Sequence, residues 1–492
     1  MNMKKIVNLN ILLVLVLIFS SISCTKNFEE MNVNPNQPSD VPSTNILAFD
    51  LRYVGDNLFN AWQGMNEMCS YAGHISKIQY IDEARYEFRE GVVNNAWAYY
   101  YYSMNDLKVI QDKSDAEGTP NMKAVAMTFQ AMLLQMTTDQ WGNVPWRSAL
   151  KGTDPDDQVT LPPYDPQSQI YDDILAQLKA AADLFAEGHD DDLGDGDLLF
   201  HGDVSKWQKF CNSLRLRAAI RMSIVNPGGA KAVIEEVLGN AGKYPVMQSN
   251  DDNAFMYWPG TSPYKEPYYE DSETRDDHGV CSVLVDIQLA NNDPRLPVYA
   301  HPNPDGVYKG VDPGAVDDSE IVPTTSRIGA IYRDDPAGFT PFMRYAEVAF
   351  IIAEAAKNGW GTPGWTAQSA YEAGIVASME ENGVAAGDIE TYMAQPAIAW
   401  NNDMKQIYLE KWICLYKQGQ EAWAENRRTD VPAIDVAPGS VYVGVHNRQP
   451  FRYPYPTTEA NLNATNLEPE AAKVVDQFWG ERMWWDKRTG VN

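Results

Sequence analysis

The segment 255–269 concentrates side chains that could hold a ligand by stacking. It contains six aromatic residues in fifteen positions, whereas the chain average of 11% would give fewer than two. Flat aromatic rings can lie against the apolar faces of a ligand such as a sugar, while a few polar groups hold its hydroxyls. Four Pro or Gly residues stiffen the segment, which lowers the entropic cost of ordering it on binding.

Two kinds of contact are expected from this segment and its flank. The candidates are aromatic residues for stacking, and Glu270 or Arg275 for hydrogen bonding: Trp258, Tyr264, Tyr268, Tyr269, Glu270 and Arg275. The alternative is that these rings hold a long loop onto the body of the protein. Because ligand sites favour such loops, binding stands beside packing as a hypothesis.

A second aromatic stretch, 71–86, forms the expected loop between the first two helices. Tyr80 and Arg85 are its candidates for a second rim of the site. Further along, Trp97 and the tyrosines at 99–102 lie on a predicted helix, where four successive residues cover every face. For that cluster we expect mostly core packing.

Paired carboxylates could act as general acid and base, and Glu347 with Glu354 is the pair to consider. Seven residues of helix would separate them by ~10.5 Å along the axis, whereas glycosidase carboxylates lie ~5–9.5 Å apart. Their helix is apolar almost all round, so buried ion pairing with a partner such as Arg344 is the better interpretation. The chain also has no G-x-S-x-G or P-loop motif. We therefore expect a protein that is not an enzyme.

The acidic run from Asp190 to Asp197 is the candidate for a cation site. Aligned to a calcium-binding loop from Asp191, it lacks the second carboxylate ligand, and Gly202 stands where Glu is needed. A turn before a helix explains the run better, although a structural calcium ion stays open. The six His are scattered and include no i, i+4 pair, which argues against zinc. No other cofactor is predicted.

Five cysteines are too few for a disulfide-dense scaffold. Four of them are internal and could pair in three ways in an oxidising compartment: Cys69, Cys211, Cys281 and Cys414. Two of these, Cys211 and Cys414, have apolar neighbours on predicted helices, where a free Cys behaves as a small hydrophobe. Reduced core thiols are therefore the favoured prediction.

The N-terminus carries an export signal. Lys4 and Lys5 precede an apolar run that is too short to span a bilayer, and small residues follow it, so residues 1–23 are interpreted as a signal peptide. The next residue, Cys24, suggests a bacterial lipoprotein, although Ser21 departs from the Leu usual there; the alternative is an ordinary secreted protein. Residues 24–45 have the composition of a flexible tether behind the acylated Cys24.

The composition is that of a globular protein and argues against one that binds nucleic acid. With 44% hydrophobic and 22% charged residues, the 492-residue chain is close to the globular average. Its net charge is −28, and removal of residues 1–23 with two Lys gives 37 − 67 = −30 for the mature chain. Nucleic acid is excluded as a partner, because its phosphates are bound by Lys and Arg, which are in deficit.

Helices must position the candidate residues, since helical periodicity covers most of the chain. Helices are expected at 45–70, 92–113, 121–138, 167–187, 204–225, 228–239, 342–357, 366–382 and 402–425. Short connections favour stacked helical hairpins. Two long irregular regions, 240–341 and 426–470, interrupt the pattern. The sequence therefore predicts a mainly α fold, with one helical domain at 46–492 and two elaborated loop regions.

Seven blocks spread from residue 28 to residue 456 resemble one known family. They include Phe28-Glu-Glu-Met-Asn-Val-Asn-Pro-Asn, Gln140-Trp-Gly-Asn-Val-Pro-Trp, Gly196-Asp-Leu-Leu-Phe-His-Gly-Asp-Val-Ser-Lys-Trp, Asn292-Asp-Pro-Arg-Leu, Tyr345-Ala-Glu-Val-Ala-Phe, Gln418-Gly-Gln-Glu-Ala-Trp and Phe451-Arg-Tyr-Pro-Tyr-Pro. Their types and order resemble the SusD/RagB family of outer-membrane lipoproteins, in particular its SusD-like 2 branch. None of the blocks lies in 255–269, so no ligand-binding residue is carried over.

The resemblance implies a fold of tetratricopeptide-like helix pairs and a lipid-anchored protein on the cell surface of the Bacteroidota outer membrane. Such proteins cover a SusC-like, TonB-dependent transporter and pass it captured glycans for nutrient uptake without chemistry. In RagB-like cases the cargo is peptide, which is the first alternative. A surface glycoside hydrolase is the second. The sequence does not name the glycan.

Overall fold

Helices make up most of the described part of the chain, which confirms the predicted fold class. The structure, a computed structural model, describes residues 41–154, 156–316 and 321–492, and residues 43–492 form one compact unit. The predicted signal peptide, Cys24 and the tether up to residue 40 lie outside the described residues. Among the described residues, none of the helices combines the length and the apolar character that crossing a bilayer requires.

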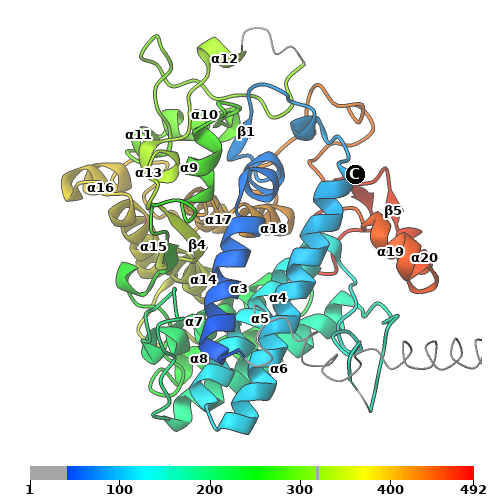
Figure 1. The fold of residues 1–492 in the computed structure, drawn as a ribbon. Helices are drawn as coiled ribbons and strands as arrows, with labels where there is room; N and C mark the ends of the chain where they lie inside the picture. Colours follow the sequence, from blue (N-terminus) through cyan, green and yellow to red (C-terminus); the bar gives the residue numbers. More distant parts are fainter. Residues whose placement is uncertain (1–40, 155, 317–320) are drawn as a thin grey trace, which may run out of the picture. The chain divides into compact units, whose positions relative to one another are not determined.

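The first half of the unit is a series of long helices. They are α3 (Ser43–Leu58), α4 (Glu90–Glu117), α5 (Pro120–Trp141), α6 (Gln167–Glu187), α7 (Val204–Arg221) and α8 (Pro227–Gly239). Each packs on the next, and Figure 1 shows α3 and α4 side by side. The turn between α4 and α5 is tight, because Gly118 has a φ of 70° at the C-cap of α4 and Pro120 opens α5. Consecutive helix pairs therefore form the scaffold, as predicted.

A second group of helices encloses α14 (Tyr345–Lys357). Its other members are α15 (Ala367–Glu381), α16 (Ala386–Met393), α17 (Met404–Cys414) and α18 (Gly419–Thr429). Helix α14 contacts α7, α15 and α17, so every residue from Ala346 to Ala355 is buried. The single helix predicted at 402–425 is two helices, because Lys417 between them has a φ of 68°. A left-handed residue of this kind ends a helix.

The described residues of the irregular region predicted at 240–341 form only short elements. They are η3 (Asn250–Asp252), β2 (Ala254–Tyr257), α9 (Pro267–Ser272), β3 (His278–Val280), α10 (Ser282–Ala290), α11 (Leu296–Tyr299), α12 (Ile321–Thr324), α13 (Ala330–Arg333) and β4 (Phe339–Met343). Strand β2 pairs antiparallel with β4, and β3 pairs antiparallel with β1 (Ile75–Lys77). These two pairings bring the candidate stretches 255–269 and 71–86 onto the same helical body.

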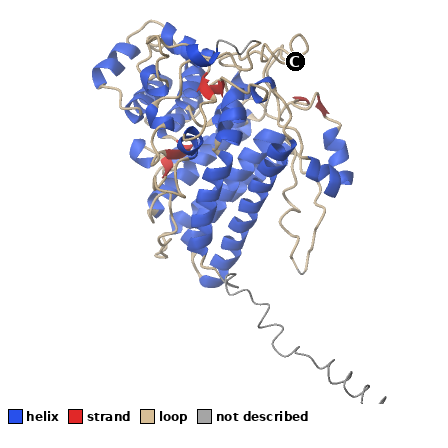
Figure 2. Ribbon diagram, turned by 45° about the horizontal axis from the view of Figure 1, so that its top comes forward, coloured by secondary structure: helices blue, strands red, loops and turns tan. Residues whose placement is uncertain are grey.

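The C-terminal part surrounds the end of α18 with loops and small elements. These are α19 (Thr457–Leu462), α20 (Ala464–Ala471) and the hairpin of β5 (Val474–Val475) with β6 (Trp479–Gly480). Each of the three sheets in the described residues has two strands, and Figure 2 shows how little of the ribbon they occupy. The region predicted as irregular at 426–470 thus begins inside α18 and includes two short helices.

Candidate functional site

The aromatic residues in and next to β2 differ in how much of each side chain is exposed. Phe255 and Tyr257 lie two residues apart on the same face of the strand. Both rings contact Phe339, but Phe255 is buried while Tyr257, at the end of the strand, is 64% exposed. Trp258 is only 4% exposed, and its indole N–H donates a hydrogen bond of 3.0 Å to Thr340 Oγ1. The Trp258 ring packs against α3 at Gly55, where a Cβ would approach it to 3.0 Å.

Helix α9 buries a second ring of the same segment. Tyr268 is fully buried, and the Lys417 ammonium lies 4.7 Å from its ring centroid. Glu266 accepts hydrogen bonds from the backbone N–H groups of Tyr268 and Tyr269, and it pairs with Lys417 at 2.9 Å. Trp258 and Tyr268 therefore hold the loop onto the helical body. Neither offers a ring face to a ligand in this structure, which corrects the expectation of stacking for these two.

The other predicted residues of this segment reach the surface. Tyr264 is 39% exposed, and the Arg52 guanidinium lies 4.4 Å from its ring centroid. Tyr269 is half-buried, and Glu270 is exposed and lines a hollow beside α3. The Arg275 side chain is exposed and donates a 3.1 Å hydrogen bond to a neighbouring aspartate. Of these four residues, only Glu270 lines one of the hollows described below.

Of the two candidates in the stretch 71–86, one lines a hollow. Arg85, in the short helix η2 (Glu83–Arg85), donates hydrogen bonds to the carbonyl oxygens of Ala315 and Val316 and lines a hollow that also contains Tyr442. Tyr80 is 67% exposed, with the Lys77 ammonium 5.9 Å from its ring centroid. The structure thus places Arg85 and Tyr80 in different surroundings.

Three neighbouring hollows run from the junction of α3, the π-helical segment η1 (Ala61–Cys69) and the start of α4 to the 439–442 loop. The first, of about 360 Å³, lies between Trp62 and Glu270. The second, of about 430 Å³, contains Trp62, Tyr99 and Phe88. The third, of about 470 Å³, contains Phe88, Arg85 and the 439–442 loop. Because Trp62 lines the first two hollows and Phe88 the last two, we call the three together the Trp62 groove.

Local sequence explains why Trp62 stands at the surface. Helix α3 ends at Leu58, and Asn60 caps η1 by accepting hydrogen bonds from the backbone N–H groups of Trp62 and Gln63 at 2.9 and 3.0 Å. Asn is among the preferred N-cap residues, since its side-chain oxygen satisfies backbone donors that have no helical partner. Trp62 follows this cap in the first turn of η1 and is 47% exposed.

The groove combines ring faces with amides and charged groups. Amides line mainly the second hollow, from Asn57, Asn60 and Asn95, next to the charged Arg89 and Glu90. Carboxylates dominate the polar lining of the first hollow, from Asp56, Glu270 and Asp271. An amide offers both a donor and an acceptor, which suits hydroxyl groups. This is the chemistry expected of a site that stacks a ring on Trp62 and holds its hydroxyls from the side.

A buried carboxyl group lies behind the second hollow. Gln63, which lines that hollow, donates a 3.3 Å hydrogen bond to Glu67, and the Tyr453 hydroxyl also donates to Glu67. Burial raises the pKa of Glu67 to about 8, against the lowering effect of the Tyr453 hydrogen bond. This network connects η1 to the C-terminal segment and fixes the wall of the groove.

A further hollow of about 430 Å³ lies between α6 and the C-terminal segment. Charged side chains dominate its lining, among them Arg452, Lys473 and Glu481, and Trp484 is its single aromatic residue. Several of these charges pair with each other, as Lys473 does with Glu470 at 2.8 Å. This hollow lacks the ring surfaces that the Trp62 groove offers.

The carboxylates considered for catalysis are buried in ion pairs. Arg217 donates to both oxygens of Glu347 at 2.6 and 2.7 Å, and Arg428 donates to both oxygens of Glu354 at 2.6 Å. The predicted partner of Glu347 was Arg344, which instead pairs with a glutamate of α15. The prediction of buried pairing is confirmed and the partner is corrected, because α7 crosses α14 on the side where Glu347 points.

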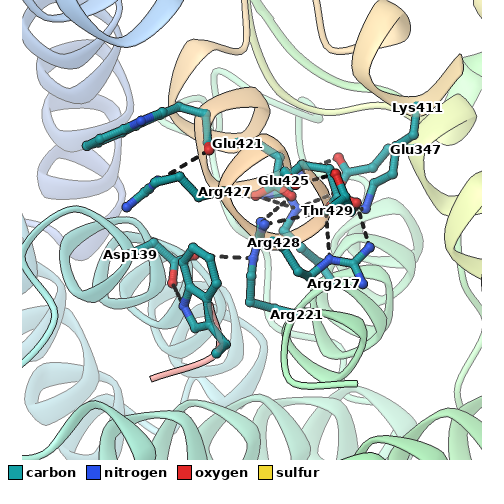
Figure 3. Close-up of polar contacts among 12 residues, drawn as sticks. Asp139, Arg217, Arg221, Glu347, Lys411, Glu421, Glu425, Arg427, Arg428 and Thr429 are labelled. Carbon is teal, nitrogen blue, oxygen red and sulfur yellow. Dashed lines mark hydrogen bonds and ion pairs between the residues drawn. The ribbon is translucent and has the colours of Figure 1, made fainter. Parts of the chain in front are cut away.

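These pairs belong to a larger network between α5, α7, α14, α17 and α18. Figure 3 shows Arg217 and Arg221 of α7 directed toward the carboxylates of α14 and α18. Glu425 receives Arg428 and Lys411, and despite burial, which raises its pKa, these cations hold that pKa below its usual range. All these groups are closed off from solvent, so the network supports the fold and leaves no carboxylate free for general acid or base chemistry in it.

The acidic run at 190–197 serves backbone turns. Asp197 accepts hydrogen bonds from the backbone N–H groups of Leu199, Phe200 and Gly202. Asp191 accepts from two backbone N–H groups in the first turn of α5. This arrangement matches the predicted turn before a helix. The residues described include no group of three or more His, Cys, Asp or Glu side chains that could hold a metal ion.

The four internal thiols are free and buried, which confirms the prediction of reduced core cysteines. Burial raises the pKa of Cys69 to about 11 and that of Cys211 to about 12. Both thiols are therefore protonated at neutral pH, and neither is a poised nucleophile.

Sequence reasoning missed the ring at the centre of the groove. Trp62 lies inside the helix predicted at 45–70, where a single tryptophan is expected to pack in the core. The available signal was Asn60, a preferred cap residue two positions before it. In the 97–102 cluster, Trp97 and Tyr100 are buried and Tyr102 is 63% exposed, which confirms that part of the cluster packs and part reaches solvent.

The fold has close counterparts among solved structures. A chitin-binding SusD homologue from Flavobacterium johnsoniae is 24% identical, with 90% of this chain and 98% of that chain covered and a TM-score of 0.78. A SusD homologue from Bacteroides uniformis is 22% identical over 91% of this chain and all of that chain, with a TM-score of 0.79. A SusD-like protein from Bacteroides thetaiotaomicron is 25% identical over 92% of this chain and all of that chain, with a TM-score of 0.76. Comparison with curated protein sequences gives no match.

The family model reaches the same result from the sequence. It matches residues 35–456 and carries the description "Starch-binding associating with outer membrane". That span includes α3, η1 and the first turns of α4, which form the Trp62 groove, and it extends to the Pro456 that precedes α19. The chain belongs to the SusD-like 2 family.

Proposed function

We propose that this protein is a non-catalytic lipoprotein of the outer-membrane surface that captures glycans in the Trp62 groove. The observation that carries the proposal is the half-exposed Trp62 ring, which lines two hollows whose walls carry amides and carboxylates. Sugars present one apolar ring face and a periphery of hydroxyls, and this groove offers a complement to both. The family description and the chitin-binding relative support a glycan as the cargo.

The finer parts of the proposal rest on the family and on the N-terminal residues. Cys24 is the proposed acylation site, and a SusC-like, TonB-dependent transporter is the proposed recipient of the glycan. Replacing Cys24 with Ala should release the protein from the membrane fraction, whereas Ser21→Ala should not. Recovery of the Cys24→Ala protein entirely with membranes would contradict lipid anchoring. Affinity purification of the membrane-bound protein should recover a barrel transporter.

Calorimetric titration against a panel of neutral oligosaccharides and mixed peptides tests the cargo. The panel should include α-linked glucose oligomers and oligomers of N-acetylglucosamine. We expect at least one glycan to bind and the peptides not to bind. Binding of peptides alone would assign the protein to peptide uptake. Release of reducing sugar from a bound glycan by the pure protein would overturn the non-catalytic assignment.

A further inference from the structure

A smaller pocket lies between α3 and α4 beside the Trp62 groove. It has a volume of about 260 Å³ and is lined by Phe49, Asp50, Tyr53, Tyr102, Ser103 and Asp106, together with Asn105. In the proposed function the groove stacks and hydrogen-bonds a neutral ring. This pocket differs in that one of its two carboxyl groups, Asp50, is fully buried among aromatic walls.

Two buried polar side chains of the pocket have no partner beyond each other. Asp50 is fully buried, and its carboxyl group has no hydrogen-bond partner other than the Ser103 hydroxyl. The Ser103 hydroxyl is fully buried as well and has no other partner. Most buried polar groups in folded proteins are hydrogen-bonded, and a carboxylate left without a partner is costly to bury. Unused acceptors on a pocket wall indicate that a ligand supplies the missing donors.

A second carboxyl group, that of Asp106, makes the pocket acidic. Asp106 is half-buried in the same lining. Burial, with a further contribution from the charge of Asp106, raises the pKa of Asp50 to about 8. Two acids that face one pocket repel each other when ionised, and a cation between them would relieve both the repulsion and the loss of hydration. The pocket therefore favours a positively charged group.

Aromatic rings form the rest of the wall. Phe49 and Tyr53 stack with ring centroids 5.2 Å apart, and Phe49 and Tyr102 are 46% and 63% exposed. Ring faces attract ammonium groups but cannot ligate a hard metal ion, which prefers six or more oxygen ligands. A primary ammonium carries three N–H donors. Asp50, Ser103 and Asp106 offer acceptors for these donors.

The pocket adjoins the groove through a pair of rings. Tyr53, in the pocket, contacts Tyr99, in the second hollow, edge to face at 5.6 Å between centroids. We propose that the pocket binds the primary ammonium group of an amino sugar in the glycan that occupies the Trp62 groove. The inference rests on the proposed function and narrows its substrate class to glycans with free amino groups.

The test compares two oligomers of glucosamine of equal length, one fully N-acetylated and one fully deacetylated. Calorimetric titration at mildly acidic pH, where the free amines are protonated, should give a dissociation constant roughly tenfold to hundredfold lower for the deacetylated oligomer, as expected for a hydrogen bond to a charged group. The Asp50→Asn and Asp106→Asn variants should each bring the ratio of the two constants close to one. Trp62→Ala should weaken both oligomers by a similar factor.

The outcomes separate this inference from the proposed function. If both oligomers bind equally to the unaltered protein, the ammonium site is refuted and glycan capture stands. If no glycan of the panel binds, both proposals fail. A preference that survives Asp50→Asn and Asp106→Asn, with melting curves that show both variants folded, would also refute the site. Stoichiometric Ca²⁺ binding that Asp50→Asn abolishes would reassign the pocket to a metal, and tighter binding of a lysine peptide would reassign it to peptide.

Discussion

Replacing Trp62 with Ala should weaken glycan binding without unfolding the protein. A tryptophan offers on the order of 250 Å² of surface, and Trp62 leaves 47% of its surface exposed. A sugar that covers between half and all of that exposed area buries roughly 60–120 Å² of the ring. At about 25 cal/mol per Å², this contributes about 1.5–3 kcal/mol to binding. The dissociation constant should therefore rise roughly 10- to 150-fold.

Calorimetric titration with the best glycan of the panel measures the effect. The matched control is Trp365→Ala, because Trp365 is half-buried next to the start of α15 and lines none of the three hollows. That variant should retain the original dissociation constant. Melting curves should show that Trp62→Ala remains folded, since the lost side chain is half exposed. If Trp62→Ala binds within twofold of the unaltered protein, the groove is not the site.

Three further changes test the buried residues around the site. Trp258→Ala should lower the free energy of unfolding by about 3–5 kcal/mol in urea titrations, because the Trp258 ring packs in the core. Its glycan affinity should be unchanged. A variant that keeps its stability but loses glycan affinity would show that Trp258 contacts the ligand. Glu354→Gln should lower the free energy of unfolding by up to about 3–5 kcal/mol, because it removes one of the two carboxylates that pair with the buried Arg428 and leaves Glu425 as the other. A loss below about 1 kcal/mol would contradict a tight pair. Glu67→Gln should flatten the pH dependence of stability. Since burial raises the pKa of Glu67 from 4.5 to about 8, its contribution is present below pH 4.5 and is lost as pH rises through about 8. The variant should therefore gain stability relative to the unaltered protein on the order of a few kcal/mol from acid to mildly basic pH, and parallel pH curves would refute the assignment.

Local pattern was sufficient for most of the helices. The helix predicted at 167–187 is α6 with the same bounds, and those predicted at 121–138 and 366–382 differ from α5 and α15 by three residues or fewer at each end. Periodicity reports which face of a segment is buried, and that signal is local. Errors fall where a single residue changes the backbone, at Asn60 and at Lys417, because both lie inside uninterrupted apolar patterns.

The family could also be predicted from the sequence, because the seven sequence blocks that resemble it form turns and buried helix faces that the fold requires. One block contains Asp197, which holds the turn before α7 through three backbone N–H groups. Another contains Glu347, which pairs with Arg217 of a third element. Residues with such obligatory contacts keep a readable spacing along the chain.

The composition of a segment did not determine which of its rings face solvent. Trp258 and Tyr268 lie in the segment richest in aromatic residues, yet the β2–β4 pairing and the Glu266–Lys417 ion pair bury them. Trp62 lies in an ordinary helical stretch and is exposed, because its neighbours in space come from α3, α4 and the 263–271 loop. The sequence alone determined the class of fold, the family and the supply of rings. Only the tertiary structure decided which rings are free, because exposure depends on elements that are distant along the chain and meet only after folding.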